Sequence, residues 1–421
     1  MKLGRNFAWL ALAEAASKVL TFVAVAYLAR VIGPERFGYV EFAISVLLIA
    51  GLVVDQGFGP YGAREIARTP ERTGPLVAEI VAARILLAGL AYLAVTALAL
   101  LAGRSSPAGS LLLLYGLGLF ALPFLLQWVF QGHERMWPVA LLQVIRQSIY
   151  AFVIIAFVRT PEQFWLAAVA ETLGAWAAAS LGLLLYRRAL GGRLQVQFRF
   201  SRRLLAEGVP IGLSQMFWTA RMFGATAILG IVATPADLGY FGAAMRILLA
   251  AHTFVWLYFF NLLPALARGW TRADGSYRTL VGRSMRLVGV LGPILTLAWI
   301  ALSGLATTVI YGTQFAAAAG ALRWLALVWL LALLSGHYRF GLIAAGRQQA
   351  EMVCSALGAA TALAAIPGGY LLGGPAGAAA GLVVAEAVVW IAARLFAMRY
   401  LASPAPRIQL ADAPGTLRVD V

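Results

Sequence analysis

Apolar stretches of about 20 residues alternate with short polar turns along most of the chain, and about 20 apolar residues are needed to cross one bilayer core. Helix edges read from such a pattern carry an uncertainty of about 2–4 residues. The pattern predicts an all-α, polytopic membrane protein with twelve transmembrane helices, at roughly 7–29, 38–60, 77–101, 110–130, 137–158, 164–186, 209–231, 239–262, 285–309, 320–344, 351–372 and 377–398.

The composition agrees with this interpretation. Of 421 residues, 62% are hydrophobic and 12% are charged, about half the charge of a typical soluble domain. An ordinary soluble enzyme and a disordered protein are therefore excluded. Cys354 is the one cysteine, so a disulfide-stapled secreted domain is excluded as well.

The chain carries a formal net charge of +16. In a soluble domain this would suggest nucleic-acid binding, but in membrane proteins Lys and Arg gather in cytoplasmic loops. With an even number of crossings both termini lie on one side, and the loops predicted on the other side contain Arg30, Arg36, Arg104 and Arg159. We therefore expect both termini in the cytoplasm and no nucleic-acid partner.

A polar, arginine-rich segment at residues 187–208 divides the predicted helices six to six. The expected organisation is an N-terminal lobe (1–186), a basic cytoplasmic linker (187–208), a C-terminal lobe (209–398) and a cytoplasmic tail (399–421). The linker suits the surface of the anionic inner leaflet, and a regulatory site is the alternative.

The two halves share a short motif, P-x-x-[F/L]-G-Y, at Pro34–Tyr39 and Pro235–Tyr240, an offset of 201 residues. Repeats with equal, even helix counts have the same topology and are related by an axis along the membrane normal, with a central site between them. This arrangement is typical of transporters.

Several charged side chains fall within the predicted helices, where a charge costs about 2.5–3.5 kcal/mol on insertion scales. Lys18, Arg146 and Arg221 lie near the middle of their helices, Arg246 lies two turns from a helix end, and Arg84 lies nearer the cytoplasmic surface. Such cations either line an aqueous cavity or form buried ion pairs that hold helices together.

The predicted intramembrane acids are fewer than the bases: Glu14, Glu41, Asp55, Glu171 and Glu386. Pairing alone therefore leaves positive charge uncompensated. A diphosphate is a good chemical match because guanidinium groups bind phosphate oxygens bidentately, although chloride or lipid headgroups match too. Glu14, Asp55 and Glu171 are candidates for binding a coupling cation or proton, with Asp55 and Glu14 as our expected coupling residues.

Sequence motifs for catalysis are absent. The sequence contains no G-x-x-x-x-G-K-[ST], H-E-x-x-H, C-x-x-C or G-x-S-x-G motif, and its three histidines are far apart. The loops predicted outside are short, which argues against a membrane glycosyltransferase. We expect a protein that is not an enzyme and has no cofactor or metal.

Some segments resemble a known family, the polysaccharide-transporter flippases of the multidrug/oligosaccharidyl-lipid/polysaccharide exporter superfamily. The resemblance is most specific in the first 70 residues and continues in two later turns; its segments are Ala29–Tyr39, Asp55–Gly59, Arg64–Arg68, Gln131–Arg135 and Ala345–Gln348.

The resemblance implies two six-helix bundles around a cationic central cavity, in the bacterial inner membrane. It implies flipping of a polyprenyl-diphosphate-linked oligosaccharide to the periplasmic leaflet for surface polysaccharide biosynthesis, with the polymerase machinery as a candidate partner. On this basis Lys18, Arg146, Arg221 and Arg246, with Arg84, are the expected substrate-binding residues. Family members often carry an acid just after the arginine of helix seven, whereas this chain has Met222 and Phe223.

Two alternative functions are a cation-coupled multidrug exporter on the same fold and an integral-membrane sugar-lipid enzyme. A non-transporting membrane scaffold is a third. The exporter would favour acids and aromatic residues over a cationic cavity, the enzyme predicts catalytic acids on a large loop, and the scaffold needs no cations in mid-membrane.

Overall fold

A computed structural model describes residues 2–103, 106–194, 196, 198, 201–272 and 275–401. Within these ranges the side chains of residues 2–14, 210, 211, 213–215, 217, 218, 220 and 221 lie outside the description. All regular elements in the described residues are helices, and the prediction of an all-α membrane protein is confirmed.

The elements follow one another with short connections. In the first half they are α1 (Lys2–Asp55), α2 (Phe58–Arg68), η1 (Pro70–Arg72), α3 (Thr73–Leu101), α4 (Pro107–Gly116), η2 (Leu117–Phe124), α5 (Gln127–Gly132), α6 (Met136–Phe157), η3 (Pro161–Trp165) and α7 (Leu166–Leu190). In the second half they are α8 (Arg202–Met222), α9 (Gly224–Val232), α10 (Pro235–Arg272), α11 (Ser276–Tyr311), η4 (Thr313–Phe315), α12 (Ala318–Ala344) and α13 (Gln348–Leu401).

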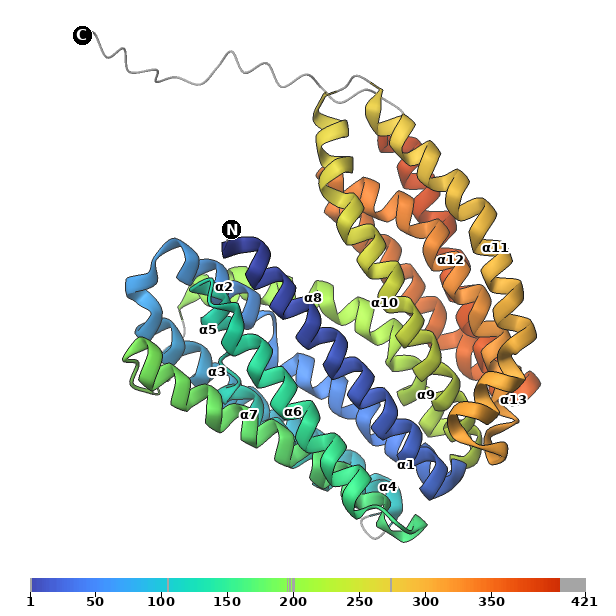
Figure 1. The fold of residues 1–421 in the computed structure, drawn as a ribbon, viewed down its shortest axis with the longest axis horizontal. Coiled ribbons are helices and arrows are strands. Elements are labelled where there is room, and N and C mark those ends of the chain that lie inside the picture. The colour runs from blue at the N-terminus through green and yellow to red at the C-terminus, as the bar shows by residue number, and fades with distance from the viewer. Residues whose placement is uncertain are drawn as a thin grey trace.

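The two longest helices, α1 and α13, are each bent at glycine. Gly33 has φ 76° and ψ 169°, and Gly373 and Gly374 also leave the helical region. Proline follows each break, at Pro34 and Pro375, where a missing backbone N–H costs little. Each long helix therefore consists of two limbs, and Figure 1 shows α1 descending from the N-terminus and returning.

Nine segments of the described residues are long and apolar enough to cross a membrane, and two of them, residues 15–68 and 348–401, are 54 residues long. These two contain the bends at Gly33 and at Gly373–Gly374, where sequence analysis placed turns between helices. The count of twelve crossings stays a prediction.

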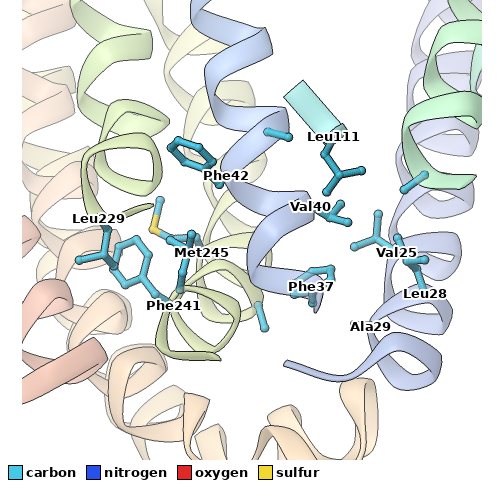
Figure 2. Packing of buried hydrophobic residues seen from close by; sticks show 14 of the residues in the cluster. Val25, Leu28, Ala29, Phe37, Val40, Phe42, Leu111, Leu229, Phe241 and Met245 are labelled. Carbon is cyan, nitrogen blue, oxygen red and sulfur yellow. The ribbon is translucent and has the colours of Figure 1, made fainter. Parts of the chain in front are cut away.

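The two halves of the chain pack against each other near the bend of α1. Figure 2 shows this buried cluster, in which Val25 and Val40, from the two limbs of α1, lie beside each other, and Phe241 of α10 lies beside Leu229 of α9. These side chains are at most 3% exposed. Removal of their apolar surface from lipid and water, together with close packing, stabilises this end of the molecule.

Away from this contact the halves separate. The ribbons of α1–α7 and of α10–α13 spread apart toward the end where α1 begins, with α8 lying between them (Figure 1). We call this the basic end, because Arg64, Arg72, Arg187 and Arg203 lie there. The opposite end, at the bend of α1, is called the closed end.

The predicted linker is partly helical. Helix α7 continues to Leu190 and ends at Gly191, which adopts φ 63°, and α8 begins at Arg202 after a Ser201 cap whose side chain accepts a bond from the Leu204 N–H. The connection between the halves is therefore shorter than the 187–208 span predicted from polarity. The charged residues at its edges extend helices instead.

Candidate functional site

The repeated motif meets itself at the closed end. A Cβ atom added to Gly38 would lie 1.8 Å from the carbonyl oxygen of Pro235, and one added to Gly239 would lie 1.9 Å from that of Pro34. The two contacts are reciprocal, as expected for residues beside a pseudo-twofold axis. Only glycine permits this approach, so the motif brings the backbones of the two halves into direct contact.

Polar contacts reinforce the closed end. The Arg30 Nε donates to the carbonyl oxygen of Ile310 at 2.8 Å, at the last turn of α11, and Gln314 Nε2 donates to the Arg30 carbonyl at 2.8 Å. A cation at a helix C-terminus is favourable because carbonyl groups there lack intrahelical partners. These bonds also join the two halves.

An ion pair follows the two repeated motifs, since Glu41 is two residues beyond the first and Arg246 is six residues beyond the second. Arg246 of α10 donates from Nε and Nη2 to Glu41 Oε1 of α1, at 2.9 and 2.8 Å. The Glu41 side chain is 7% exposed and that of Arg246 is 23% exposed. A glycine at 242 makes room for the carboxylate, since a Cβ there would lie 2.6 Å from the Cγ of Glu41.

Lys18 faces the other half of the molecule. Its Nζ lies 3.5 Å from the Thr253 Oγ1 of α10, and the lysine is exposed. Thr253 and Arg246 are seven residues apart on α10, so both lie on one helix face about 10 Å apart. Lys18 and Arg246 therefore lie along the same interface between the halves, with Lys18 nearer the basic end.

Two other predicted substrate residues are ion-paired within the first half. Arg146 of α6 pairs with Glu171 of α7, where both side chains are partly exposed. Arg84 of α3 pairs with Asp55 at the end of α1. For both arginines the structure shows the alternative that the sequence left open, a carboxylate partner.

The Arg84–Asp55 pair is enclosed by its surroundings. The Arg84 side chain is 6% exposed and its guanidinium lies 5.9 Å from the centroid of the Trp128 ring. A Cβ at Gly59 would lie 3.0 Å from Arg84 Nη2 and 3.3 Å from Asp55 Oδ1. Gly59 thus leaves space for the ion pair. This explains why glycine occupies the last position of Asp55–Gly59, one of the segments on which the family resemblance rests.

Two predicted site residues cannot be placed by their side chains. Those of Glu14 and Arg221 lie outside the described residues, and so the roles assigned to them stay predictions. The structure thus brings Lys18 and Arg246 to one interface and places Arg146 and Arg84 in separate pairs within the first half.

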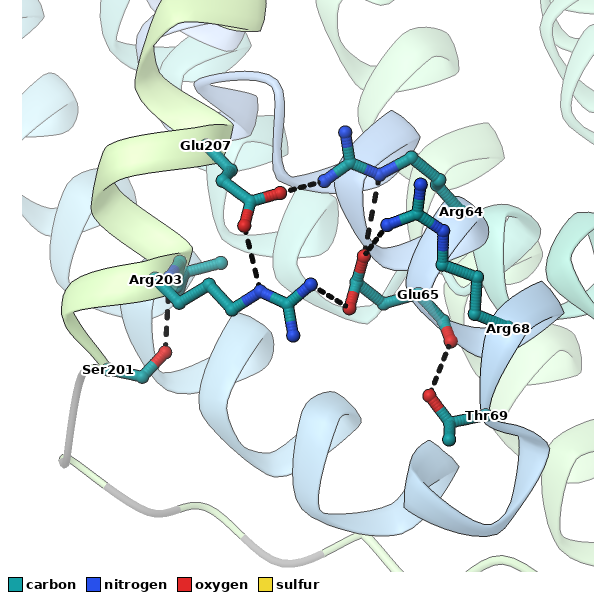
Figure 3. Close-up of polar contacts among 8 residues, drawn as sticks. Arg64, Glu65, Arg68, Thr69, Ser201, Arg203 and Glu207 are labelled. Atoms are coloured by element: carbon teal, nitrogen blue, oxygen red, sulfur yellow. Dashed lines mark hydrogen bonds and ion pairs between the residues drawn. The ribbon is translucent and has the colours of Figure 1, made fainter. Parts of the chain in front are cut away.

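A charged cluster joins α2 to α8 at the basic end (Figure 3). Arg203 donates to Glu207 at 2.8 Å and pairs with Glu65 at 3.0 Å, while Arg64 pairs with both acids and Arg68 pairs with Glu65. The hydrogen bond from Arg203 and the charges of Arg203 and Arg64 hold the pKa of the Glu207 carboxyl below its ordinary value. The cluster connects the first helix of the second half with the first half.

Two hollows lie outside the contact between halves. One of about 430 Å³ is lined by Phe254, Leu257, Tyr258, Asn261 and Leu262 of α10. Another, of about 440 Å³, opens at the basic end beside Glu71, His133 and Arg193. Burial and the charge of Arg135 lower the pKa of His133 there. Among the described residues no group of three His, Cys, Asp or Glu side chains is placed to hold a metal ion.

Comparisons with known proteins agree with this architecture. The family model described as "Polysaccharide biosynthesis protein" matches residues 3–270. The chain belongs to this family. Its resemblance to polysaccharide-transporter flippases is thereby confirmed, as is the prediction that the chain is not an enzyme, since the family and its relative are transporters.

One curated relative is the "Putative O-antigen transporter" of Escherichia coli (strain K12), 23% identical over 251 residues. The match covers 59% of this chain and 60% of the relative, so it spans about three fifths of the relative's length.

Two solved structures share the fold of this family member. An inward-facing multidrug resistance MATE family transporter of the MOP superfamily superposes with TM-score 0.72 and 16% identity, covering 91% of this chain and 95% of that one. The lipid II flippase MurJ, in an inward closed conformation, superposes with TM-score 0.70 and 12% identity, covering 93% and 87%.

Sequence analysis did not identify the ion-pair partners of the intramembrane acids in this family member. Glu41 was recognised as an intramembrane acid but not as the partner of Arg246, which is 205 residues away. One signal was available: position 242, equivalent to Glu41 in the repeat, is glycine, and Arg246 follows four residues later. The pairing of Arg203 with Glu207 was visible as an i, i+4 spacing.

Proposed function

We propose that this multi-pass membrane protein is a flippase that moves a polyprenyl-diphosphate-linked oligosaccharide from the cytoplasmic to the periplasmic leaflet of the bacterial inner membrane. It would do so by alternating access, with both termini in the cytoplasm, and would supply surface polysaccharide biosynthesis. The family match, the name of the curated relative and the shared fold support this function.

The observation that carries the proposal is the pair of cations along one interface. Lys18 and Arg246 lie on opposing elements of the two halves, on the path that a substrate between the halves must take. A cation within a membrane is costly unless an anion neutralises it. A diphosphate can interact with Lys18 and, by displacing Glu41, with Arg246 as well. Guanidinium and ammonium groups bind phosphate oxygens through charge-assisted hydrogen bonds.

The shape supports access from the basic end. The glycine contact at residues 38 and 239 joins the halves at one end, whereas the ribbons diverge at the other (Figure 1). If the basic end is cytoplasmic, as the arginine distribution favours, this is a conformation ready to accept substrate from the cytoplasm. The apolar hollow beside Phe254 and Leu257 on α10 suits a prenyl chain.

The other predicted residues keep their proposed roles. Arg146, Arg221 and Arg84 are proposed as further cations on the substrate path, and Asp55 and Glu14 as coupling residues. Since Arg84 is held by Asp55 and Arg146 by Glu171, these arginines contact substrate in this proposal only after exchange with their carboxylate partners.

The test is a reconstituted flipping assay. The purified protein is placed in liposomes containing a fluorescent polyprenyl-diphosphate N-acetylglucosamine, and movement of the probe between leaflets is followed by quenching from one side. We expect Lys18→Gln to reduce the initial rate by about tenfold, equivalent to about 1.4 kcal/mol of lost interaction with the diphosphate. Arg323→Gln, which removes an exposed cation on α12, is the matched control and should flip at the wild-type rate.

Two results would count against a flippase. One is a wild-type rate no faster than in empty liposomes, especially if the vesicles expel a cationic dye, which would favour the multidrug exporter. The other is an unchanged rate in Lys18→Gln, which would remove the cation interface from the proposal.

A further inference from the structure

The ion pair between Glu41 and Arg246 breaks the pseudo-symmetry of the closed end. At the repeat offset of 201, Glu41 corresponds to Gly242 and Arg246 corresponds to Ser45. The first half thus provides the carboxylate, the second half provides the guanidinium, and each counterpart position is small. A single charge pair crosses the interface next to the contact of Gly38 with Gly239.

Opening of the closed end must break this pair. Glu41 is three residues from Gly38, and Gly242 is three residues from Gly239, so both lie one helical turn from the backbone contact. When the halves move apart there, the guanidinium and the carboxylate separate with them. Removal of one partner from a buried pair is strongly destabilising, so both charges need a new partner.

The other polar groups around Glu41 do not supply a second cationic partner for its carboxylate in the present arrangement. Tyr115 of α4, Tyr150 of α6 and Tyr311 of α11 feel the charges of both Glu41 and Arg246, and Glu171 of α7 acts on Tyr115 and Tyr150. The hydroxyls of Tyr115 and Tyr311 are buried without a hydrogen-bond partner among the described residues. The groups named around Glu41 are therefore three tyrosine hydroxyls, the carboxylate of Glu171 and the guanidinium of Arg246. Arg246 is the only cation among these named groups.

We propose that Glu41 is a proton-carrying carboxylate of the transport cycle, in addition to the coupling residues proposed above. This rests on the proposed flippase function. When the closed end opens, Arg246 exchanges the carboxylate for the substrate diphosphate, and Glu41 binds one proton from the periplasmic side to become a neutral acid. When the halves close again, Glu41 must lose that proton to pair with Arg246, and the open basic end receives it. One proton thus moves inward as one lipid-linked glycan moves outward.

The geometry distinguishes Glu41 from the two intramembrane acids that pair with Arg84 and Arg146. Asp55 pairs with Arg84, and Glu171 pairs with Arg146, in each case within the first half. Separation of the halves leaves these two pairs intact. Glu41 is paired across the interface, so its partner changes in every cycle.

The first experiment is independent of substrate. In a Cys354→Ser background, a cysteine at Phe42, which is 7% exposed and packs against Gly230 of α9, is labelled in spheroplasts by a membrane-impermeant maleimide only when the closed end opens. Because maleimide reacts with the thiolate, the labelling rate is divided at each pH by that of free glutathione in the same buffer. We expect this ratio to rise as the outside pH falls, by up to about tenfold per pH unit for one proton. In Glu41→Gln the ratio should be high and independent of pH, because the neutral amide mimics the protonated acid.

The matched control is Glu162→Gln. Glu162 pairs with Arg36 at 3.0 Å within the first half, so its loss should leave the pH response of labelling at position 42 unchanged. A pH response that survives in Glu41→Gln overturns the proposal. Should Glu41→Gln fail to fold because it strands Arg246, the double variant Glu41→Gln/Arg246→Gln removes both charges and must also be insensitive to pH.

The second experiment measures coupling in the flipping assay. A pH gradient, acidic on the side of the closed end, should accelerate outward movement of the fluorescent probe by wild type and by Glu162→Gln. Glu41→Gln should flip without acceleration. Failure of wild type to flip, with a Glu41-dependent pH response in the labelling assay, would reject the flippase and retain the proton site. Equal acceleration in Glu41→Gln would reject the proton site and retain the flippase.

Discussion

Arg84 shows that an intramembrane charge stabilises the fold when it has a partner of opposite charge. Its side chain is 6% exposed and its carboxylate partner, Asp55, is 32% exposed. Pairing with Asp55 offsets the free-energy cost of placing the Arg84 guanidinium within the membrane. At the scale of the residue, Arg84 thus stabilises the junction of α1, α2 and α3, and this effect is separable from any contact with substrate.

Arg84→Gln should therefore reduce the free energy of unfolding in detergent by about 3 kcal/mol, the lower part of the range for a broken buried pair, because Asp55 is partly exposed. Arg84→Gln/Asp55→Asn should regain most of the loss, since no charge is stranded. Thermal and denaturant unfolding measure both variants beside Arg323→Gln. A double variant no more stable than Arg84→Gln would show that the pair is not what stabilises this junction.

The charged cluster of Figure 3 predicts a dependence on pH. Because Arg203 and Arg64 lower the folded-state pKa of Glu207, its contribution to stability is complete above the ordinary glutamate pKa of about 4.3. The contribution is lost as the pH falls through the lowered value. The melting temperature of wild type should therefore fall more steeply on acidification than that of Glu207→Gln. Parallel curves for the two proteins would contradict this.

At the scale of the element, glycine determines where helices touch. Gly38 and Gly239 lie in the interiors of α1 and α10, where glycine usually destabilises a helix by about 1 kcal/mol relative to alanine. Here each glycine allows a carbonyl oxygen of the opposite half to approach the backbone. The loss of helix stability at each glycine is offset by the close backbone contact, which holds the two halves together at the closed end.

Gly239→Ala should accordingly open the closed end, because its Cβ would lie 1.9 Å from the carbonyl oxygen of Pro34. We expect faster maleimide labelling of a cysteine at Phe42 than in the protein without the alanine substitution, at every pH compared. Gly289→Ala is the control, since a Cβ at this position of α11 meets nothing within 4 Å. Slow labelling of Gly239→Ala, equal to that of the control, would mean that the contact does not limit opening.

At the scale of the whole molecule, function requires the two halves to move apart at one end while they meet at the other. The closed end combines an apolar core, the glycine contact, the Arg30 bonds and a charge pair. The charged cluster between α2 and α8 links the halves at the basic end. Both sets of contacts are present in this conformation, so alternating access must break those of the closed end while α10–α13 move toward the first half at the basic end.

A disulfide across the closed end should stop transport. The Cβ of Glu41 lies 3.1 Å from the Cβ position of residue 242, close to the mean of about 3.8 Å in disulfides. In a Cys354→Ser background, oxidised Glu41→Cys/Gly242→Cys should not flip the fluorescent probe. Reduction should restore the rate of the single variant Glu41→Cys. Equal flipping by the oxidised and reduced protein would show that this interface stays closed throughout transport.

The sequence by itself determined the all-α membrane class and the turns at Gly33 and Gly373, because hydrophobic length, glycine and proline act locally. It also identified the repeated motif and the intramembrane charges. Only the tertiary structure decided that the two motifs meet, that Arg84, Arg146 and Arg246 have carboxylate partners, and that Glu41 alone among these acids pairs across the halves. Partners such as Glu41 and Arg246 are 205 residues apart, and a charge acts on whatever is near it in space, which the order of residues along the chain does not specify.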